Sequence, residues 1–387
     1  MGVKKHNHSD VVKSYQAYKS RVAKETIPCY EPSIGREELR LVGDVIKRNW
    51  LSENKYTREF ESRLAKICER KYSVAFANAT AALICGMKAL GIKEGDEIIV
   101  PSFSHSADPN SIANSGATVV FVDIDPITMC LTRQTIEKAI TKKTKAILYV
   151  CAYGNVSNLD AVADYAKSKK IFLINDCAPA LFGRYKNKPI ASYGDFSVLS
   201  FFADKTITTG EGGMLLSNNI ALINKVNMYK HDGRRERGVD VIEYKGYNFR
   251  ITELQTAVGV AQLKKAAYFV KRKKEILRFY AKKLSDVSSV RVFAFNSDGD
   301  IVPHRVVIFV PDAKKLIAYL TSLGIGVRGM FMPMHSMPAY MNPASLTKGN
   351  FPNTQEIYKT GVCLPSAPSL TDKNIEFICQ SIKKFYT

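Results

Sequence analysis

Apolar, strand-like runs alternate with amphipathic segments from about residue 35 to about residue 230. Such alternation is typical of a mainly parallel sheet covered by helices, so it restricts the chain to an α/β architecture. The clearest strands are rich in Val, Ile, Leu or Phe, and we predict them over 73–76, 97–100, 118–122, 146–150, 172–175 and 196–201. Helices are expected between them, for example over 80–90 and 159–168.

A different pattern begins near residue 252. It predicts a long helix, then a strand, then two shorter helices, over 252–284, 302–310, 313–323 and 372–385. Because 387 residues exceed what one hydrophobic core usually takes, we expect two domains. The predicted division is a polar, basic extension, a large domain and a smaller α+β domain, over 1–28, 29–265 and 266–387. The extension is either a frayed arm or a helix packed on a partner subunit.

Basic residues outnumber acidic ones, with 56 Lys and Arg against 36 Asp and Glu, and the formal net charge is +20. A surface of this sign attracts anions, which fits nucleic acids and phosphorylated metabolites alike. The densest basic run is Lys271-Arg272-Lys273-Lys274, inside a helix-like segment. We interpret it as a solvated helix face rather than as a nucleic-acid patch or an import signal.

No stretch approaches the roughly 18 consecutive apolar residues of a membrane-spanning helix, and the start Met-Gly-Val-Lys-Lys-His has no apolar run. We therefore expect a soluble, cytoplasmic protein that binds neither membrane nor nucleic acid. The 8 cysteines form no Cys-x-x-Cys pair and no histidine stands at zinc-finger spacing. They are expected to be reduced core residues, and no metal site is predicted.

Ligands of such sheets bind beyond the carboxyl ends of the strands, so polar residues that follow a strand are the first candidates for a site. Asn78, Ser102 to His105, Asp176 and Lys205 meet this condition. Lys205 lies in the segment Ser-Phe-Phe-Ala-Asp-Lys-Thr-Ile-Thr-Thr-Gly-Glu-Gly-Gly, where a strand runs into a glycine-rich turn. A lysine desolvated there has a lowered pKa and acts as a Schiff-base nucleophile, whereas by itself a lysine in a loop is usually a surface charge.

The other two candidates suit the remaining parts of pyridoxal phosphate. Asp176 follows the strand Phe-Leu-Ile-Asn, where its carboxylate can keep the ring nitrogen of the cofactor protonated. A helix N-cap is the alternative for Asp176. At Ala77-Asn-Ala-Thr80 a strand breaks into a helix, whose N–H groups and the Thr80 hydroxyl can hold a phosphate. Here a plain cap at Asn78 or Thr80 is the alternative. The turn Gly210 to Gly213 matches neither the dinucleotide fingerprint nor a Walker loop.

From about Cys29 to the C-terminus the chain resembles the DegT/DnrJ/EryC1/StrS family of sugar aminotransferases. The motifs that carry the resemblance are the Lys205 segment, Trp50-Leu-Ser, Gly95-Asp-Glu-Ile-Ile-Val-Pro-Ser-Phe-Ser, Gly116-Ala-Thr-Val-Val-Phe-Val-Asp, Gly246-Tyr-Asn-Phe-Arg and Pro333-Met-His-Ser-Met-Pro. The chain is most similar to the perosamine- and viosamine-type 4-aminotransferases. The resemblance implies an aspartate-aminotransferase-like fold of fold type I and a homodimer with composite active sites.

The resemblance also implies a role for each residue that matches a family motif. Lys205 is the cofactor-binding lysine and carries the proton transfer between cofactor and substrate, and Asp176 is the partner of the ring nitrogen. His105 holds the position of the ring that stacks on the cofactor. The phosphate contacts are Ser200, Thr80, the backbone at Ala79 and, from the neighbouring subunit, Asn248. His335 is either a residue near the sugar or a structural histidine.

Three features depart from the family pattern. Ala79 stands where the family usually has Gly, and Pro179 where it has Gln, His or Glu. The loop that begins at Trp50 is about one residue shorter than usual, which puts the detailed sugar contacts in doubt.

The implied reaction has two halves. L-Glutamate loads nitrogen onto the cofactor as pyridoxamine 5'-phosphate, and this form aminates C4 of a 4-keto-6-deoxyhexose linked to UDP, dTDP or GDP. Amination at C3 of a 3-keto sugar is the nearest alternative. A related branch of the family dehydrates C3 and carries histidine at the position of Lys205. A non-catalytic, basic binding protein of the same fold is the alternative from another class.

Overall fold

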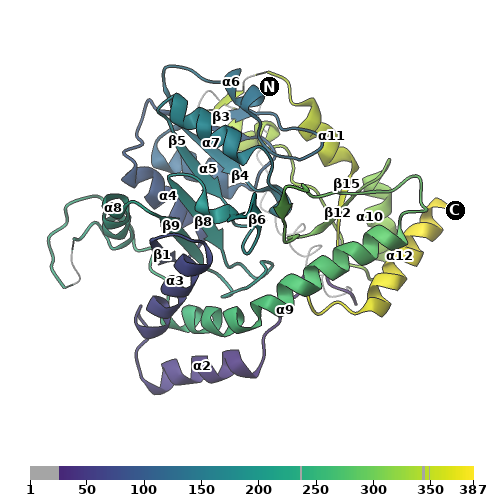
Figure 1. Ribbon diagram of the computed structural model, residues 1–387, viewed down its shortest axis with the longest axis horizontal. Coiled ribbons are helices and arrows are strands. Elements are labelled where there is room, and N and C mark those ends of the chain that lie inside the picture. Colours follow the sequence, from purple (N-terminus) through teal and green to yellow (C-terminus); the bar gives the residue numbers. More distant parts are fainter. Residues whose placement is uncertain (1–25, 236–237, 342–344, 348) are drawn as a thin grey trace, which may run out of the picture.

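The computed structural model describes residues 26–235, 238–341, 345–347 and 349–387. Most of the extension predicted over 1–28 lies outside this range. The described chain contains a large and a small β-sheet connected by one long helix, α9 (Glu253–Lys283), which crosses Figure 1 below both sheets. A third sheet has three short strands in the order β11-β6-β7, with bounds Gly299–Asp300, Arg184–Tyr185 and Lys188–Pro189. No helix in the described ranges is both long enough and apolar enough to cross a membrane.

The large sheet has eight strands in the order β1-β9-β8-β5-β4-β2-β3-β14. Their bounds are Tyr72–Phe76 (β1), Glu97–Pro101 (β2), Thr118–Val122 (β3), Thr144–Val150 (β4), Phe172–Asp176 (β5), Phe196–Ser200 (β8), Gly213–Ser217 (β9) and Ser345–Thr347 (β14). All neighbours are parallel except β9, which runs antiparallel to both β1 and β8. The mainly parallel sheet and every strand predicted for it are confirmed, whereas β9 and β14 were not predicted.

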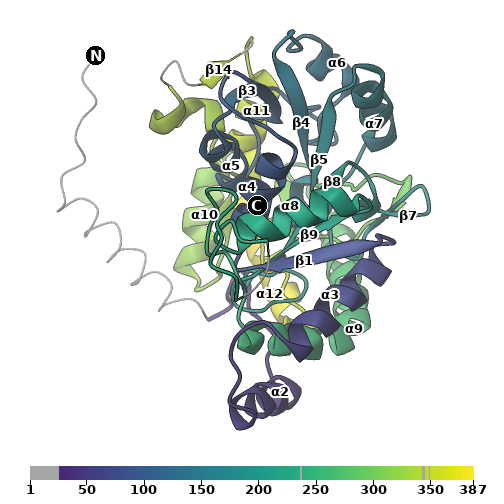
Figure 2. The ribbon, with the colours of Figure 1, turned by 90° about the vertical axis from the view of Figure 1, so that its left-hand side faces the viewer.

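Helices cover both faces of the large sheet, and successive strand residues point alternately to one face and the other. Ile98 and Val100 pack in the core under one layer, and Ile99 packs in the core under the other. The first layer contains α4 (Ala79–Ala89), α5 (Ala107–Ser115) and α8 (Ile220–Lys230), and the second contains α3 (Lys55–Ile67), α7 (Leu159–Ser168) and the first half of α9. Figure 2 shows α8 across one face, and α2 (Arg36–Lys47) at the edge of the molecule.

The small sheet is antiparallel, in the order β10-β12-β15-β13. Its strands are Arg291–Val292 (β10), Val306–Phe309 (β12), Gly361–Leu364 (β15) and Arg328–Gly329 (β13), and it packs against α10 (Ala313–Ser322), α12 (Asp372–Tyr386) and the second half of α9. The strand predicted over 302–310 is thus shorter, because residues 302–305 form an irregular segment instead. The predicted domain boundary at residue 265 falls inside α9, and the division into domains stays a prediction.

Two predictions about side chains have opposite outcomes. All eight cysteines are buried and free, as expected for core residues. The prediction that Lys271 to Lys274 form a solvated helix face is wrong for Lys273, which is only 4% exposed. Its ammonium donates to the backbone carbonyl of His304 at 3.0 Å, in the core between the two sheets.

Candidate active site

A cavity of about 380 Å³ lies where the carboxyl ends of β4, β5 and β8 meet the first turn of α4. The predicted site residues that line it are Ala79, Thr80, His105, Asp176, Ser200 and Lys205, and Asn78 and Pro179 line it too. Residues from four separate strand ends therefore converge on one hollow, as the strand-end rule predicts.

Lys205 lies in the loop after β8, and its backbone N–H donates to the carbonyl of Phe202 at 3.0 Å. Its side chain is 17% exposed and ends 3.7 Å from Oδ1 of Asp204. The Thr208 hydroxyl donates to the carbonyl of Phe201 at 2.9 Å and closes the loop beneath the lysine. The loop therefore presents one largely desolvated amine to the cavity.

Asp176 ends β5 and is 6% exposed. Its Oδ1 accepts a hydrogen bond from the backbone N–H of Ala178 at 2.9 Å, and a turn rather than a helix follows, so the N-cap alternative does not apply. Burial raises the pKa of Asp176, and the neighbouring Lys205 and Asp108 oppose that rise. Asp108, on α5, is fully buried, and burial followed by the charge of Asp176 raises its pKa well above the ordinary value. Burial thus favours the neutral form of both carboxyl groups, and that of Asp108 more strongly.

The first turn of α4 forms the end of the cavity that suits a phosphate. Asn78 is the N-cap of α4, with its Oδ1 accepting from the backbone N–H of Ala81 at 2.9 Å. The N–H groups of Ala79 and Thr80 belong to the first turn of α4, where backbone donors have no intrahelical acceptor. Ser200, at the end of β8, lies beside them in the cavity wall. N–H groups and hydroxyls at a helix N-terminus form an anion site.

The rest of the cavity wall is aromatic and basic, and apart from His105 the sequence analysis did not predict it. Tyr153 stacks on Phe331 with ring centroids 5.4 Å apart and 12° between the planes, and His105 meets Phe331 edge to face at 5.8 Å. Arg305 and Arg328 line the same wall, and both lie over the ring of Tyr30. Arg305, Arg328 and Phe331 of this wall lie in or beside strands of the small sheet, whereas His105 and Tyr153 follow β2 and β4 of the large sheet.

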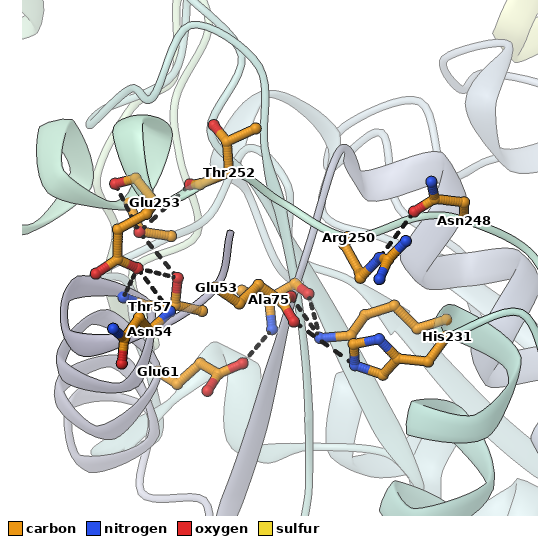
Figure 3. Close-up of polar contacts among 12 residues, drawn as sticks. Glu53, Asn54, Thr57, Glu61, Ala75, His231, Asn248, Arg250, Thr252 and Glu253 are labelled. Atoms are coloured by element: carbon orange, nitrogen blue, oxygen red, sulfur yellow. Dashed lines mark hydrogen bonds and ion pairs between the residues drawn. The ribbon is translucent and has the colours of Figure 1, made fainter. Parts of the chain in front are cut away.

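Asn248 and His335 lie outside the cavity. Asn248 is exposed, and Figure 3 shows its side chain beside Arg250, whose Nε donates to Asn248 Oδ1 at 2.9 Å. Nδ1 of His335 lies 2.6 Å from the hydroxyl of Ser102, and its ring stacks on Phe351 with centroids 3.9 Å apart. Ser102 therefore supports His335 and, unlike His105, does not face the cavity.

The loop that begins at Trp50 is tied to α9 by a buried carboxylate. Glu253 accepts hydrogen bonds from the backbone N–H groups of Asn54 and Thr57 at 2.8 and 3.2 Å (Figure 3). It also accepts one from the backbone N–H of Tyr56 at 2.7 Å. Nearby, Lys230 donates to Glu53 at 2.8 Å and to the carbonyl of Ala75 at 3.1 Å. These contacts fix the loop against β1 and the first turn of α9.

A comparison with protein-family models matches residues 32–383 to the DegT/DnrJ/EryC1/StrS aminotransferase family. The chain belongs to this family. It is 37% identical over 368 residues to the GDP-perosamine synthase of Escherichia coli O157:H7. The aligned region covers 93% of this chain and 99% of that relative. It is also 30% identical over 375 residues to the dTDP-4-dehydro-2,3,6-trideoxy-D-glucose 4-aminotransferase of Saccharopolyspora spinosa. That alignment covers 92% of this chain and 96% of the relative.

Solved structures agree with this assignment. Spr1654 of Streptococcus pneumoniae, assigned as a sugar aminotransferase and solved in its PMP form, superposes with a TM-score of 0.88 at 26% identity, covering 92% of this chain and 97% of that chain. The chain is therefore a sugar aminotransferase with an α/β structure of fold type I, and its cofactor is pyridoxal 5'-phosphate.

The residues of this DegT/DnrJ/EryC1/StrS aminotransferase fit that cofactor in chemical type. The cavity offers one amine, one buried carboxylate and one helix N-terminus, from Lys205, Asp176 and α4. These suit an aldehyde, a pyridine nitrogen and a phosphate respectively. Across residues 26–387, with the gaps named above, no cluster of His, Cys, Asp or Glu suits a metal ion.

Proposed function

We propose that the enzyme transfers the amino group of L-glutamate to C4 of a GDP-linked 4-keto-6-deoxyhexose, giving a GDP-4-amino-4,6-dideoxyhexose of the perosamine type. The observation that carries the proposal is the convergence of Lys205 and Asp176 on one cavity at the N-terminus of α4. The choice of GDP rests on the similarity to the GDP-perosamine synthases. A dTDP- or UDP-linked sugar, and amination at C3, are the alternatives that the experiment below separates.

In this proposal Lys205, Asp176 and Asp108 act at the reacting end of the site. When bound, the cofactor supplies an electron sink for the carbon from which a proton is removed. The Lys205 amine, once it is free, takes that proton and returns it to the other reacting carbon. Asp176 holds a negative charge at the ring nitrogen, and burial together with that charge favours the neutral form of Asp108. Ser200, Thr80 and the backbone at Ala79 hold the phosphate, and the imidazole of His105 lies against the ring.

Arg328 is our proposed contact for the carboxylate of the amino donor. Its guanidinium lines the cavity, lies over the Tyr30 ring at 5.0 Å, and has no carboxylate within ion-pair distance among the described residues. A guanidinium binds a carboxylate through two parallel hydrogen bonds, which fixes the orientation of the donor. Arg305, in contrast, already pairs with Asp204.

We further propose that the enzyme is a homodimer in which Asn248 completes the site of the partner subunit. Asn248 is exposed and remote from its own cavity, and Arg250 occupies its amide oxygen, so its NH₂ group remains to donate to a phosphate. Large apolar side chains are exposed on and beside α2, namely Ile34, Leu39, Ile46, Trp50 and Leu51. An apolar surface of this kind suits burial against a second copy of the chain.

Two measurements test the proposed function. First, the purified protein should have a visible cofactor band that L-glutamate shifts and that the Lys205→Ala variant lacks. Second, the glutamate-treated enzyme is incubated with GDP-, dTDP- and UDP-linked keto sugars, and products are identified by mass spectrometry and NMR. A protein that takes up no cofactor and binds nucleic acid in a salt-sensitive way would contradict the proposal and favour the non-catalytic alternative. Amination of only a 3-keto sugar would replace the C4 assignment.

A further inference from the structure

Asp204 immediately precedes Lys205, and its two carboxylate oxygens have different surroundings. Oδ2 forms an ion pair with Nη2 of Arg305 at 2.5 Å. Oδ1 is buried and accepts no hydrogen bond from any described residue. It lies 3.7 Å from Nζ of Lys205 and 3.6 Å from Nε2 of His304. One oxygen is therefore fixed by Arg305, and the other faces the lysine.

A buried acceptor without a partner is costly, so its place calls for an explanation. The ion pair with Arg305 does not explain the position of Oδ1, because only Oδ2 contacts the guanidinium. Nε2 of His304 also has no hydrogen-bond partner among the described residues and lies 3.6 Å from Oδ1, so the imidazole can offer an N–H to this oxygen. It offers no charge near pH 7, because burial, followed by the charge of Lys205, lowers the pKa of His304 to about 3. The group that can bring a positive charge to Oδ1 is the ammonium of Lys205.

The charges around Lys205 explain why a dedicated counter-charge is useful there. Arg305 is always charged, and Lys273 becomes charged as the pH falls, because burial followed by the charge of Arg305 lowers its pKa to about 7. Against these cations stand two carboxylates, Asp176 and Asp204. Asp176 serves the cofactor ring, which leaves Asp204 for the lysine. The titratable and charged groups that line the two cavities beside Lys205 are Tyr30, Glu31, His105, Tyr153, Asp176, Asp204, Glu211, Lys273, His304, Arg305, Arg328 and Cys363, and the charge of Lys205 also acts on Asp108.

We propose that Asp204 is a positioning residue for catalysis: its Oδ1 receives the ammonium of Lys205 whenever the freed lysine carries a proton, while Arg305 fixes the carboxylate through Oδ2. The inference rests on the proposed cofactor-binding role of Lys205. Asp204 then holds the freed lysine beside the cavity, with its proton, until the next transfer. Burial alone would raise the pKa of Asp204, but His304, Lys205 and Arg305 together hold it well below the ordinary value, so the carboxylate stays charged.

The test measures the reactivity of the Lys205 amine in the full-length enzyme. The protein is loaded with pyridoxamine phosphate, which leaves Lys205 free, and is trace-labelled with acetic anhydride from pH 6 to pH 11. Peptide mass spectrometry then gives the midpoint of Lys205 labelling. Asp204→Asn keeps the shape but removes the charge, so the midpoint should move to lower pH by about one to three units. Asp123→Asn is the matched control, since Asp123 binds the start of α11 (Pro352–Thr360) outside the cavity and should leave the midpoint unchanged.

Asp204→Asn leaves Arg305 buried without its counter-charge and can impair folding. A second comparison therefore uses Arg305→Gln as the background, with and without Asp204→Asn. These two variants differ only in the carboxylate at position 204, and the double variant should have the lower midpoint of Lys205 labelling. Equal midpoints within both pairs would overturn the role of Asp204. The pyridoxal phosphate form tests the underlying assignment separately: if Lys205 is labelled there as readily as in the pyridoxamine form, the cofactor-binding role of Lys205 is wrong.

Discussion

Gly213 packs directly against Asn78, the N-cap of α4. A Cβ atom at Gly213 would lie 2.5 Å from the carbonyl carbon of Asn78 and 2.6 Å from the backbone nitrogen of Ala79. Gly213 also pairs with Phe76 on β1 and with Ser200 on β8. The last glycine of the glycine-rich turn thus lets the sheet approach the first turn of the helix, where the phosphate of the cofactor is proposed to bind.

Gly213→Ala should therefore push α4 away from β9 and disturb the phosphate site. We expect a loss of stability of about 1–3 kcal/mol and at least a tenfold weaker affinity for pyridoxal phosphate. Thermal unfolding and a cofactor titration measure the two effects. Gly43→Ala is the control, because a Cβ there meets nothing within 4 Å and alanine favours the helix α2. An unchanged cofactor affinity in Gly213→Ala would contradict the proposed phosphate site.

The buried carboxyl group of Asp108 should lower the free energy of unfolding at high pH. Burial, followed by the charge of Asp176, raises the pKa of Asp108 above its value of about 3.9 in the unfolded chain. The folded state then keeps a proton that the unfolded state releases, so stability falls as pH rises through this window. Asp108→Asn removes the ionisable group and keeps a side chain of nearly the same shape. The variant should gain stability relative to the wild type at pH 8 and lose that gain toward pH 4, as measured by urea unfolding.

The strand ends that form the site could be predicted from the sequence, because apolar strands of a parallel sheet deliver their carboxyl ends to one edge. Asn78, His105, Asp176 and Lys205 were found in this way. His304 and Arg305 were missed because the run over 302–310 resembles one continuous strand. Pro303 was the available signal, since proline lacks the N–H that a central strand needs.

The burial of Lys273 could also have been predicted from the sequence. It shares a face of α9 with Phe269, Ile276 and Tyr280, at the spacing of a buried helical stripe, and all four are buried. The three basic neighbours of Lys273 concealed this pattern. The role of Asn248 is different, because no periodicity within one chain indicates which residues act in a second copy.

Lys273 should lower stability near neutral pH and below. Its pKa is lowered to about 7 by burial and then by the charge of Arg305, whereas an unfolded lysine titrates near 10.4. The unfolded state therefore binds more protons between these values, and the penalty grows as pH falls from about 10 to about 7. Lys273→Met should stabilise the enzyme by roughly 2–5 kcal/mol at pH 6 and have little effect at pH 10.5. An equal gain at both pH values would show that the effect is packing rather than charge.

Arg328→Leu should impair the half-reaction with L-glutamate. Loss of a bidentate, charge-assisted contact is expected to lower kcat/KM for glutamate by roughly 10- to 100-fold. Rapid-mixing absorbance measurements follow this half-reaction without the sugar. Arg291→Leu is the control, because Arg291 lies over Phe309 outside the cavity. If instead only the sugar half-reaction slows, Arg328 binds the nucleotide diphosphate rather than the donor.

The proposed action of Asn248 across the dimer can be tested by mixing two defective subunits. Lys205→Ala removes the amine, and Asn248→Asp places a negative charge beside the phosphate, so each homodimer should be nearly inactive. If Asn248 acts on the partner's site, a mixed dimer contains one intact site, formed by Lys205 of one subunit and Asn248 of the other. Random exchange of equal amounts should then restore about a quarter of the wild-type activity. If Asn248 acts within its own subunit, every site in the mixed dimer carries one of the two defects, and no activity returns. The mixing experiment requires a dimer, and size-exclusion chromatography with light scattering measures the oligomeric state.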